Sequence, residues 1–166
     1  EVPWDLTTLG GRQAMRNAWE TLDESTKAAA LRRTELLYDA EIRYTDAQLQ
    51  AVLRAYEVAG LLENTLVVVW SDHGEQMYEH GSLGHAGTLY REENDAIATF
   101  WAKNLVPGTS TVPSTHADLA PSLLDALGLD VPAEMTGRVL GMEPDEPVFS
   151  VLHPNTGQPA SGVEWQ

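Results

Sequence analysis

The sequence predicts an α/β fold in which a mixed sheet is flanked by helices. Apolar residues recur at helical spacing from Ala28 to Ala59, and Leu66–Trp70 is a short, continuous, β-branched run. Such a run is typical of a strand covered on both faces, as in a parallel sheet. A long helix, a short connection and a buried strand make half of a βαβ crossover, and no strand is apparent before the helix.

The chain before this strand is expected to be helical. A first helix is predicted over 11–22, where apolar residues recur at helical spacing. Asp23 or Ser25 is expected to cap the long helix, and Gly60 to end it in the left-handed conformation. The pattern fits one helix, or two helices with a bend near residues 44–46.

Beyond the strand, a loop rich in glycine and histidine is expected over 71–93. Two further apolar runs, 96–102 and 148–152, are predicted to be strands. The tail over 153–166 is turn-rich, and we expect it to be either poorly ordered or cut off from its structural partners.

A short capped helix is predicted between these two strands. Thr115 begins it and Asp118 stands three residues later, which is the spacing of a capping box. Pro121 fits only the first turn of such a helix, and Gly128 marks its end.

The composition limits the kinds of function open to the chain. It has 166 residues, 43% of them apolar, which suits one globular domain or part of a larger one. Ten basic against 25 acidic residues give a net charge of −15, which argues against nucleic acid and anionic membranes as partners. No apolar run is long enough to span a membrane, and the absence of cysteine excludes disulfides and a cysteine nucleophile. The cellular compartment stays open.

The segment Ser71-Asp72-His73-Gly74-Glu75 stands at the carboxyl end of the predicted strand, where open α/β sheets bind ligands. Gly74 allows a sharp turn, so that neighbouring side chains can converge. A carboxylate beside an imidazole suits a divalent metal; the histidine favours Mn or Zn, with Ca or Mg as alternatives. Taken alone, the triplet is better explained by an aspartate that caps a turn and a packed or solvated histidine than by a metal site.

The surrounding blocks make the pattern far more specific. YDAEI, NTLVVV, SDHGE, HGSLGHAG and TLYREE follow one another in order, and HADLAPSLLDALGLDVP comes later. Over about residues 31–150 the chain resembles the sulfatase branch of the alkaline phosphatase superfamily. The resemblance implies an alkaline-phosphatase-like sulfatase fold.

The resemblance also implies roles for individual residues. Asp72 and His73 match the acidic residue and its Asn-or-His neighbour that coordinate the catalytic metal. His85 falls where many sulfatases have a lysine that contacts the sulfate or phosphate oxygens, and its N–H could stabilise the leaving oxygen. The alternative for His85 is a surface histidine. Glu75 is expected to orient the loop, and His80 either supports the site or is a turn residue.

The family's nucleophile has no counterpart in this chain. In the family it is a Cys or Ser converted to formylglycine within Cys/Ser-x-Pro-x-Arg, or a Thr or Ser in phosphatase-like members. The chain has no Cys and no Ser-x-Pro-x-Arg, and the family's N-terminal aspartate ligands are missing too. We therefore expect residues 1–166 to be the C-terminal portion of a larger catalytic domain. We expect it to be inactive alone, to require the missing N-terminal half, and to self-associate through faces which that half would cover.

The leading functional hypothesis is metal-dependent hydrolysis of sulfate or phosphate and phosphonate esters, with a small anionic ester as substrate. His73, where many sulfatases have Asn, favours the phosphate side. One alternative is the ectodomain of a phosphoglycerol or phosphoethanolamine transferase, with membrane helices upstream. Another is a non-catalytic binding module that retains the fold.

Overall fold

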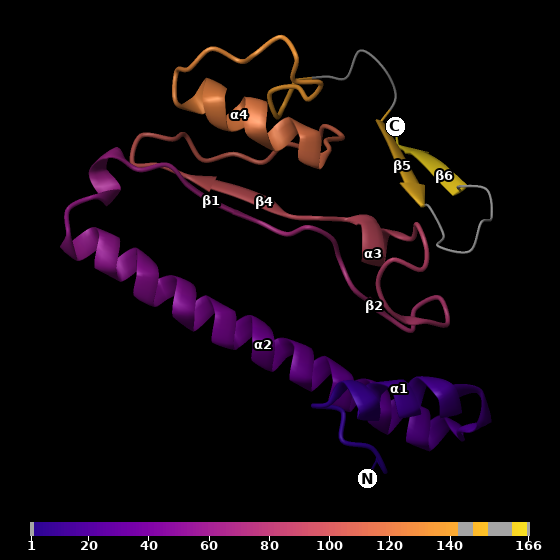
Figure 1. Ribbon diagram of the computed structural model, residues 1–166. Helices are drawn as coiled ribbons and strands as arrows, with labels where there is room; N and C mark the ends of the chain where they lie inside the picture. Colours follow the sequence, from indigo (N-terminus) through magenta and orange to yellow (C-terminus); the bar gives the residue numbers. More distant parts are fainter. Residues whose placement is uncertain (1, 143–147, 153–160, 166) are drawn as a thin grey trace. The chain divides into compact units, whose positions relative to one another are not determined.

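The computed structural model describes residues 2–142, 148–152 and 161–165 (Figure 1). Its contacts divide the chain into two compact units. The helical unit comprises residues 1–62 and 75–84, and the strand unit comprises 63–74 and 85–166. The chain first passes from one to the other within η2 (Leu62–Asn64).

The helical unit contains two helices and a short hairpin. Its elements are α1 (Leu9–Ala18), η1 (Trp19–Thr21), α2 (Glu24–Val58), β2 (Gln76–Met77) and β3 (Leu83–Gly84). The expected loop over 71–93 therefore contains an antiparallel hairpin, in which Gln76 pairs with Gly84. Local alternation did not reveal it because each strand has only two residues.

Helix α2 is one continuous helix of 35 residues, so the alternative of two helices with a bend is wrong (Figure 1). Asp23 caps it by accepting a hydrogen bond from the N–H of Thr26 at 2.9 Å. At the other end, Gly60 has a φ of 70°, as predicted. The N–H groups of Gly60 and Leu61 reach back to the carbonyls of Glu57 and Tyr56, which satisfies the last turn.

The core of the helical unit forms where the start of the chain and α1 meet α2. Leu6, Met15 and Ala30 are its buried apolar side chains among the described residues. Trp19 and Tyr78 stack at its margin, with ring centroids 3.5 Å apart and planes 12° from parallel. This stack fixes the hairpin against the helices.

The strand unit is built from short elements. They are β1 (Val67–Trp70), α3 (Arg91–Asn94), β4 (Ala98–Trp101), η3 (His116–Asp118), α4 (Leu119–Ala126), β5 (Val148–Leu152) and β6 (Ser161–Trp165). The strands expected over 66–70, 96–102 and 148–152 are confirmed. Strand β6 contradicts the expected turn-rich tail for residues 161–165, while 153–160 and 166 lie outside the described residues. Across the described ranges, no helix combines the length and the apolar character that a membrane span requires.

The neighbours of strand β1 differ from those predicted for a strand in a parallel sheet. It pairs antiparallel with β4, from Val67 opposite Trp101 to Trp70 opposite Ala98. Every strand pair among the described residues is antiparallel, so a parallel neighbour for β1 is not found there. The prediction that β1 is covered on both faces is wrong for this structure, because none of its four residues is buried: Val67–Val69 are half-buried and Trp70 is 54% exposed.

The capped helix η3–α4 is confirmed in detail. The N–H of Thr115 donates to Asp118 Oδ2 at 2.8 Å, and the Thr115 side chain completes the capping box. Gly128 ends the helix with a φ of 69°. Asp118 is buried and also accepts the N–H of Arg138 at 2.7 Å, so it ties the following loop to the helix start.

Candidate functional site

The turn that carries Asp72 and His73 is anchored on both sides. Ser71 extends the β1–β4 ladder, since it exchanges hydrogen bonds of 3.0 Å with Ile97 through its N–H and its Oγ. After the turn, the N–H of Gly74 donates to the carbonyl of Glu93 at 2.9 Å. A Cβ on Gly74 would lie 2.2 Å from the carbonyl oxygen of Glu92. Close approach of backbone therefore explains this glycine, in addition to the turn inferred from the sequence.

The hydrogen bonds of His73 determine which ring nitrogen can act as a ligand. Nδ1 lies 2.7 Å from the carbonyl oxygen of Gly74, and a carbonyl only accepts, so Nδ1 carries the proton. In the neutral ring, Nε2 then keeps its lone pair. A backbone carbonyl that holds the opposite nitrogen is the usual support of a metal-binding histidine.

Asp72 and His73 converge at a spacing that suits a metal ion. Asp72 Oδ2 lies 3.5 Å from His73 Nε2, and both side chains are solvent-accessible, at 87% and 39%. Two ligands about 2.1 Å from one ion in a tetrahedral shell lie about 3.4 Å apart. The residues present therefore fit two positions of a divalent metal shell.

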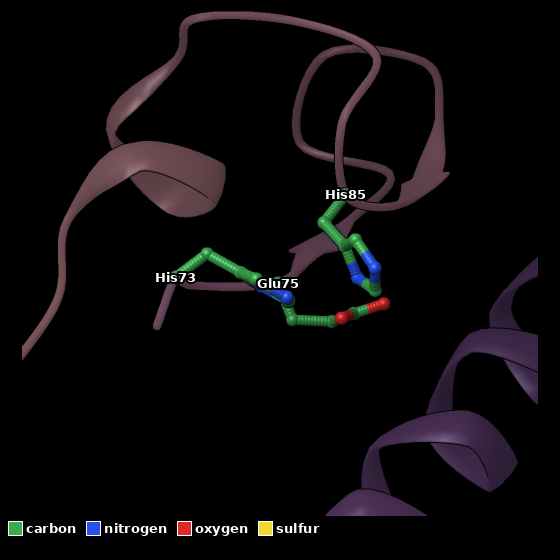
Figure 2. A group of neighbouring side chains, drawn as sticks. All are labelled: His73, Glu75 and His85. Carbon is green, nitrogen blue, oxygen red and sulfur yellow. The ribbon is translucent and has the colours of Figure 1, made fainter. Parts of the chain in front are cut away.

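His85 lies beside His73 (Figure 2). Their ring centroids are 3.9 Å apart, with the planes tilted by 36°. Glu75, also drawn in Figure 2, begins the segment grouped with the helical unit, and His80 follows in its hairpin. The strand unit thus brings together the three residues expected to carry the chemistry, Asp72, His73 and His85.

Glu93 organises the loop that follows His85, and the sequence did not single it out. Its side chain is buried, and Oε2 accepts the N–H groups of Gly87 at 2.9 Å and Thr88 at 3.0 Å. Oε1 accepts the Thr88 hydroxyl at 2.8 Å. Burial on its own would raise the pKa of Glu93, but these bonds and the nearby His85 lower it below the ordinary value. The only signal in the sequence was its place in TLYREE, where it resembles any surface carboxylate.

A cleft of about 590 Å³ opens beside Asp72 and His73 in the strand unit. Asp72, Glu93 and Asp95 line it, and neither Lys nor Arg occurs among the lining residues that the structure describes. Such a cleft attracts cations and repels anions. An anionic ester would therefore need a bound cation to enter it.

His116 also lines this cleft, although no role for it was predicted from its sequence context. Its Nε2 donates to the carbonyl of Ser71 at 2.9 Å. This bond joins η3 to the end of β1 across 45 residues of sequence, a distance that local patterns do not cover.

Comparison with known proteins identifies sulfatases among the relatives of this chain. The family model described as Sulfatase matches residues 14–129. Arylsulfatase K of Bos taurus is 28% identical over 131 residues, which cover 75% of this chain and 24% of that protein. The N-acetylglucosamine-6-O-sulfatase of Bacteroides thetaiotaomicron is 30% identical over 104 residues, covering 62% and 19%. The chain spans a quarter or less of the length of these relatives.

A solved structure shares the fold. It is a protein in complex with its substrate D-glucosamine-2-N,6-O-disulfate, and it superposes with a TM-score of 0.72 at 22% identity. The match covers 89% of this chain and 32% of that one. It confirms the predicted α/β, sulfatase-like fold. Since the family model covers most of the chain, the family inferred from the motifs is confirmed: the chain belongs to the sulfatase family.

Proposed function

We propose that the protein hydrolyses sulfate esters with the aid of a divalent metal, and that this chain supplies part of the metal and substrate site. The observation that carries the proposal is the convergence of Asp72 Oδ2 and His73 Nε2, 3.5 Å apart, at the end of β1. Membership of the sulfatase family and the names of the relatives, an arylsulfatase and an N-acetylglucosamine-6-O-sulfatase, support sulfate as the transferred group.

Asp72 and His73 are proposed to be two of the metal ligands. The imidazole favours Mn or Zn over Ca or Mg. When bound, the ion would supply positive charge that draws electron density from the ester oxygens. Two protein ligands are too few for a tight site, so we propose that the rest of the shell and the nucleophile, whether formylglycine or a Thr or Ser, lie outside this chain.

His85 is proposed to act on the leaving side. An N–H of its ring would donate a hydrogen bond to the leaving oxygen as the bond to sulfur breaks, which offsets the charge that develops there. Its place beside His73 supports this role, because the two ring centroids are 3.9 Å apart and a group bound at His73 would lie near His85.

Phosphate or phosphonate esters are the second candidate substrates. His73 stands where many sulfatases have Asn, which favours this group. A 2,3-bisphosphoglycerate-independent phosphoglycerate mutase of Ruegeria is also 33% identical over 100 residues. Sulfate and phosphate esters are similar tetrahedral anions, so the test must offer both.

The test uses the full-length protein that contains this chain. It is stripped with a chelator, reloaded with Mn²⁺, Zn²⁺, Ca²⁺ or Mg²⁺, and assayed with matched aryl sulfate and aryl phosphate esters. We expect metal-dependent sulfate release, and a loss of metal affinity of at least about 10-fold in Asp72→Asn and His73→Ala. Asp130→Asn, an exposed carboxylate outside the cleft, is the matched control.

Other outcomes of this test would favour a different function. Faster release of phosphate than of sulfate would favour the second candidate. Transfer of a phosphoglycerol or phosphoethanolamine group to an acceptor hydroxyl instead of water would favour a transferase, and failure of the full-length protein to bind metal would favour a non-catalytic module. Robust turnover by residues 1–166 alone would refute the proposal that the chain supplies only part of the site.

A further inference from the structure

We infer that Glu93 is a positioning residue that holds His85 beside His73. Its importance for turnover rests on the proposed function. Its effect on the Asp72–Gly74 turn and on the loop after His85 does not.

The side chain of Glu93 holds the loop that follows His85. Its two carboxylate oxygens accept three hydrogen bonds from Gly87 and Thr88, at 2.8 to 3.0 Å. Gly87 and Thr88 are the second and third residues after His85. Glu93 as a residue is only 5% exposed, so water competes little for these bonds.

The backbone at Ala86 shows why the loop needs this support. Its φ is 63°, a left-handed conformation that is disfavoured for alanine. Such a conformation persists when neighbouring contacts fix the chain on either side. The bonds to Glu93 begin at the next residue and supply that constraint.

The main chain of Glu93 holds the turn that follows His73. Its carbonyl accepts the N–H of Gly74, the residue after His73, at 2.9 Å. The carbonyl of Glu92, also in α3, lies so close to Gly74 that it leaves no room for a Cβ there. One residue therefore fixes the Asp72–Gly74 turn through its backbone and the His85 loop through its side chain.

The consequence is that the spacing of the two imidazoles depends on Glu93. His73 is one residue from the backbone contact, and His85 is two residues from the nearest side-chain contact. A shift of about 1 Å in a catalytic group can reduce the rate about 100-fold. Loss of the hydrogen bonds from Glu93 to the His85 loop should therefore lower turnover.

The experiment compares Glu93→Ala and Glu93→Gln in the full-length protein, with Asp125→Asn as control. Glutamine keeps an oxygen for the N–H groups of Gly87 and Thr88, and its amide can donate to the Thr88 hydroxyl. Asp125 is an exposed carboxylate on α4. Amide hydrogen exchange is measured over residues 72–74 and 85–88, together with kcat and KM.

For Glu93→Ala we expect exchange at least about 10-fold faster over 85–88, a smaller increase over 72–74, and a fall in kcat of about 10- to 100-fold with KM nearly unchanged. Glu93→Gln and the control should stay within about 3-fold of the wild type. If Glu93→Ala fails to fold, Glu93→Asp replaces it, because the shorter side chain cannot keep all three bonds.

Unchanged exchange over 85–88 in Glu93→Ala would overturn the inference. So would a Glu93→Gln variant as impaired as Glu93→Ala, since the hydrogen bonds would then not be the cause. If the wild type releases no sulfate, the proposed function fails, but the exchange data still decide whether Glu93 holds the loops.

Discussion

Gly74 lies where the backbone of α3 comes closest to the turn of Asp72 and His73. A Cβ there would overlap the carbonyl oxygen of Glu92, at 2.2 Å, and neither side is a flexible side chain. We therefore expect Gly74→Ala to destabilise the protein by about 2 kcal/mol or more. Gly108→Ala is the matched control, because nothing lies within 4 Å of its Cβ. Chemical denaturation of both variants checks this; equal midpoints would show that α3 moves aside at little cost.

At the residue scale, the sequence identified the candidate metal-binding and catalytic residues better than the residues that hold them in place. Asp72, His73 and His85 were chosen from motifs, and the structure brings them together, although their roles stay predictions. Glu93 and His116 were missed because their significance lies in their partners. His116 contacts a carbonyl 45 residues away, and a buried glutamate in an acidic run has no distinct local pattern.

At the element scale, the cap that Asp23 provides at the start of α2 depends on the ionisation of its carboxylate, so it can be tested by changing the pH. Hydrogen bonds from the backbone N–H and then the hydroxyl of Thr26 lower the pKa of Asp23 below its ordinary value of 3.8. A lowered pKa means that this cap stabilises the helix fully above about pH 4 and is lost as pH falls through the folded-state pKa.

The chemical shift of the Thr26 amide proton, followed from about pH 5 to about pH 2, should report this loss at the start of α2. The same titration in Asp23→Asn should be flat, because asparagine caps without titrating. A titration that survives in Asp23→Asn would mean that another group causes it.

Two glycines, Gly10 in α1 and Gly60 just after the end of α2, predict opposite effects of the same substitution to alanine. Gly10 lies inside α1 with nothing near its Cβ, so Gly10→Ala should stabilise the protein by about 0.5–1 kcal/mol. Gly60 is equally open but has a φ of 70°, so Gly60→Ala should destabilise it by about 1 kcal/mol. Thermal unfolding of both variants decides this, and shifts of the same sign would contradict the assigned conformations.

The elements that the sequence predicted well are those with local signals. The cap at Asp23, the left-handed Gly60 and the capping box of Thr115 and Asp118 depend on residues within one or two turns. The surroundings of β1, the β2–β3 hairpin and strand β6 were not predicted. They depend on which distant segment each strand pairs with, and no local pattern specifies that.

At the scale of the whole molecule, the chain exposes much of its apolar surface. Along α2, Ile42, Tyr44 and Val52 are more than half exposed, and Val58 follows at its end with 82%. Exposed apolar surface on this scale favours association.

We therefore expect residues 1–166 alone to self-associate in sedimentation velocity experiments as concentration rises. The double variant Ile42→Glu, Val52→Glu should associate less, because charge on the helix opposes burial of its face. A monodisperse monomer of the unmodified chain over the whole concentration range would contradict this expectation.

The central claim is that Asp72 and His73 hold a divalent metal in the full-length protein. The most direct measurement is the Mn and Zn content of the purified wild type and of the double variant Asp72→Ala, His73→Ala, by mass spectrometry after gel filtration. We predict about one ion per chain in the wild type and little in the variant, because their two ligand atoms occupy neighbouring positions of one shell. Equal metal content in the two proteins would contradict the claim.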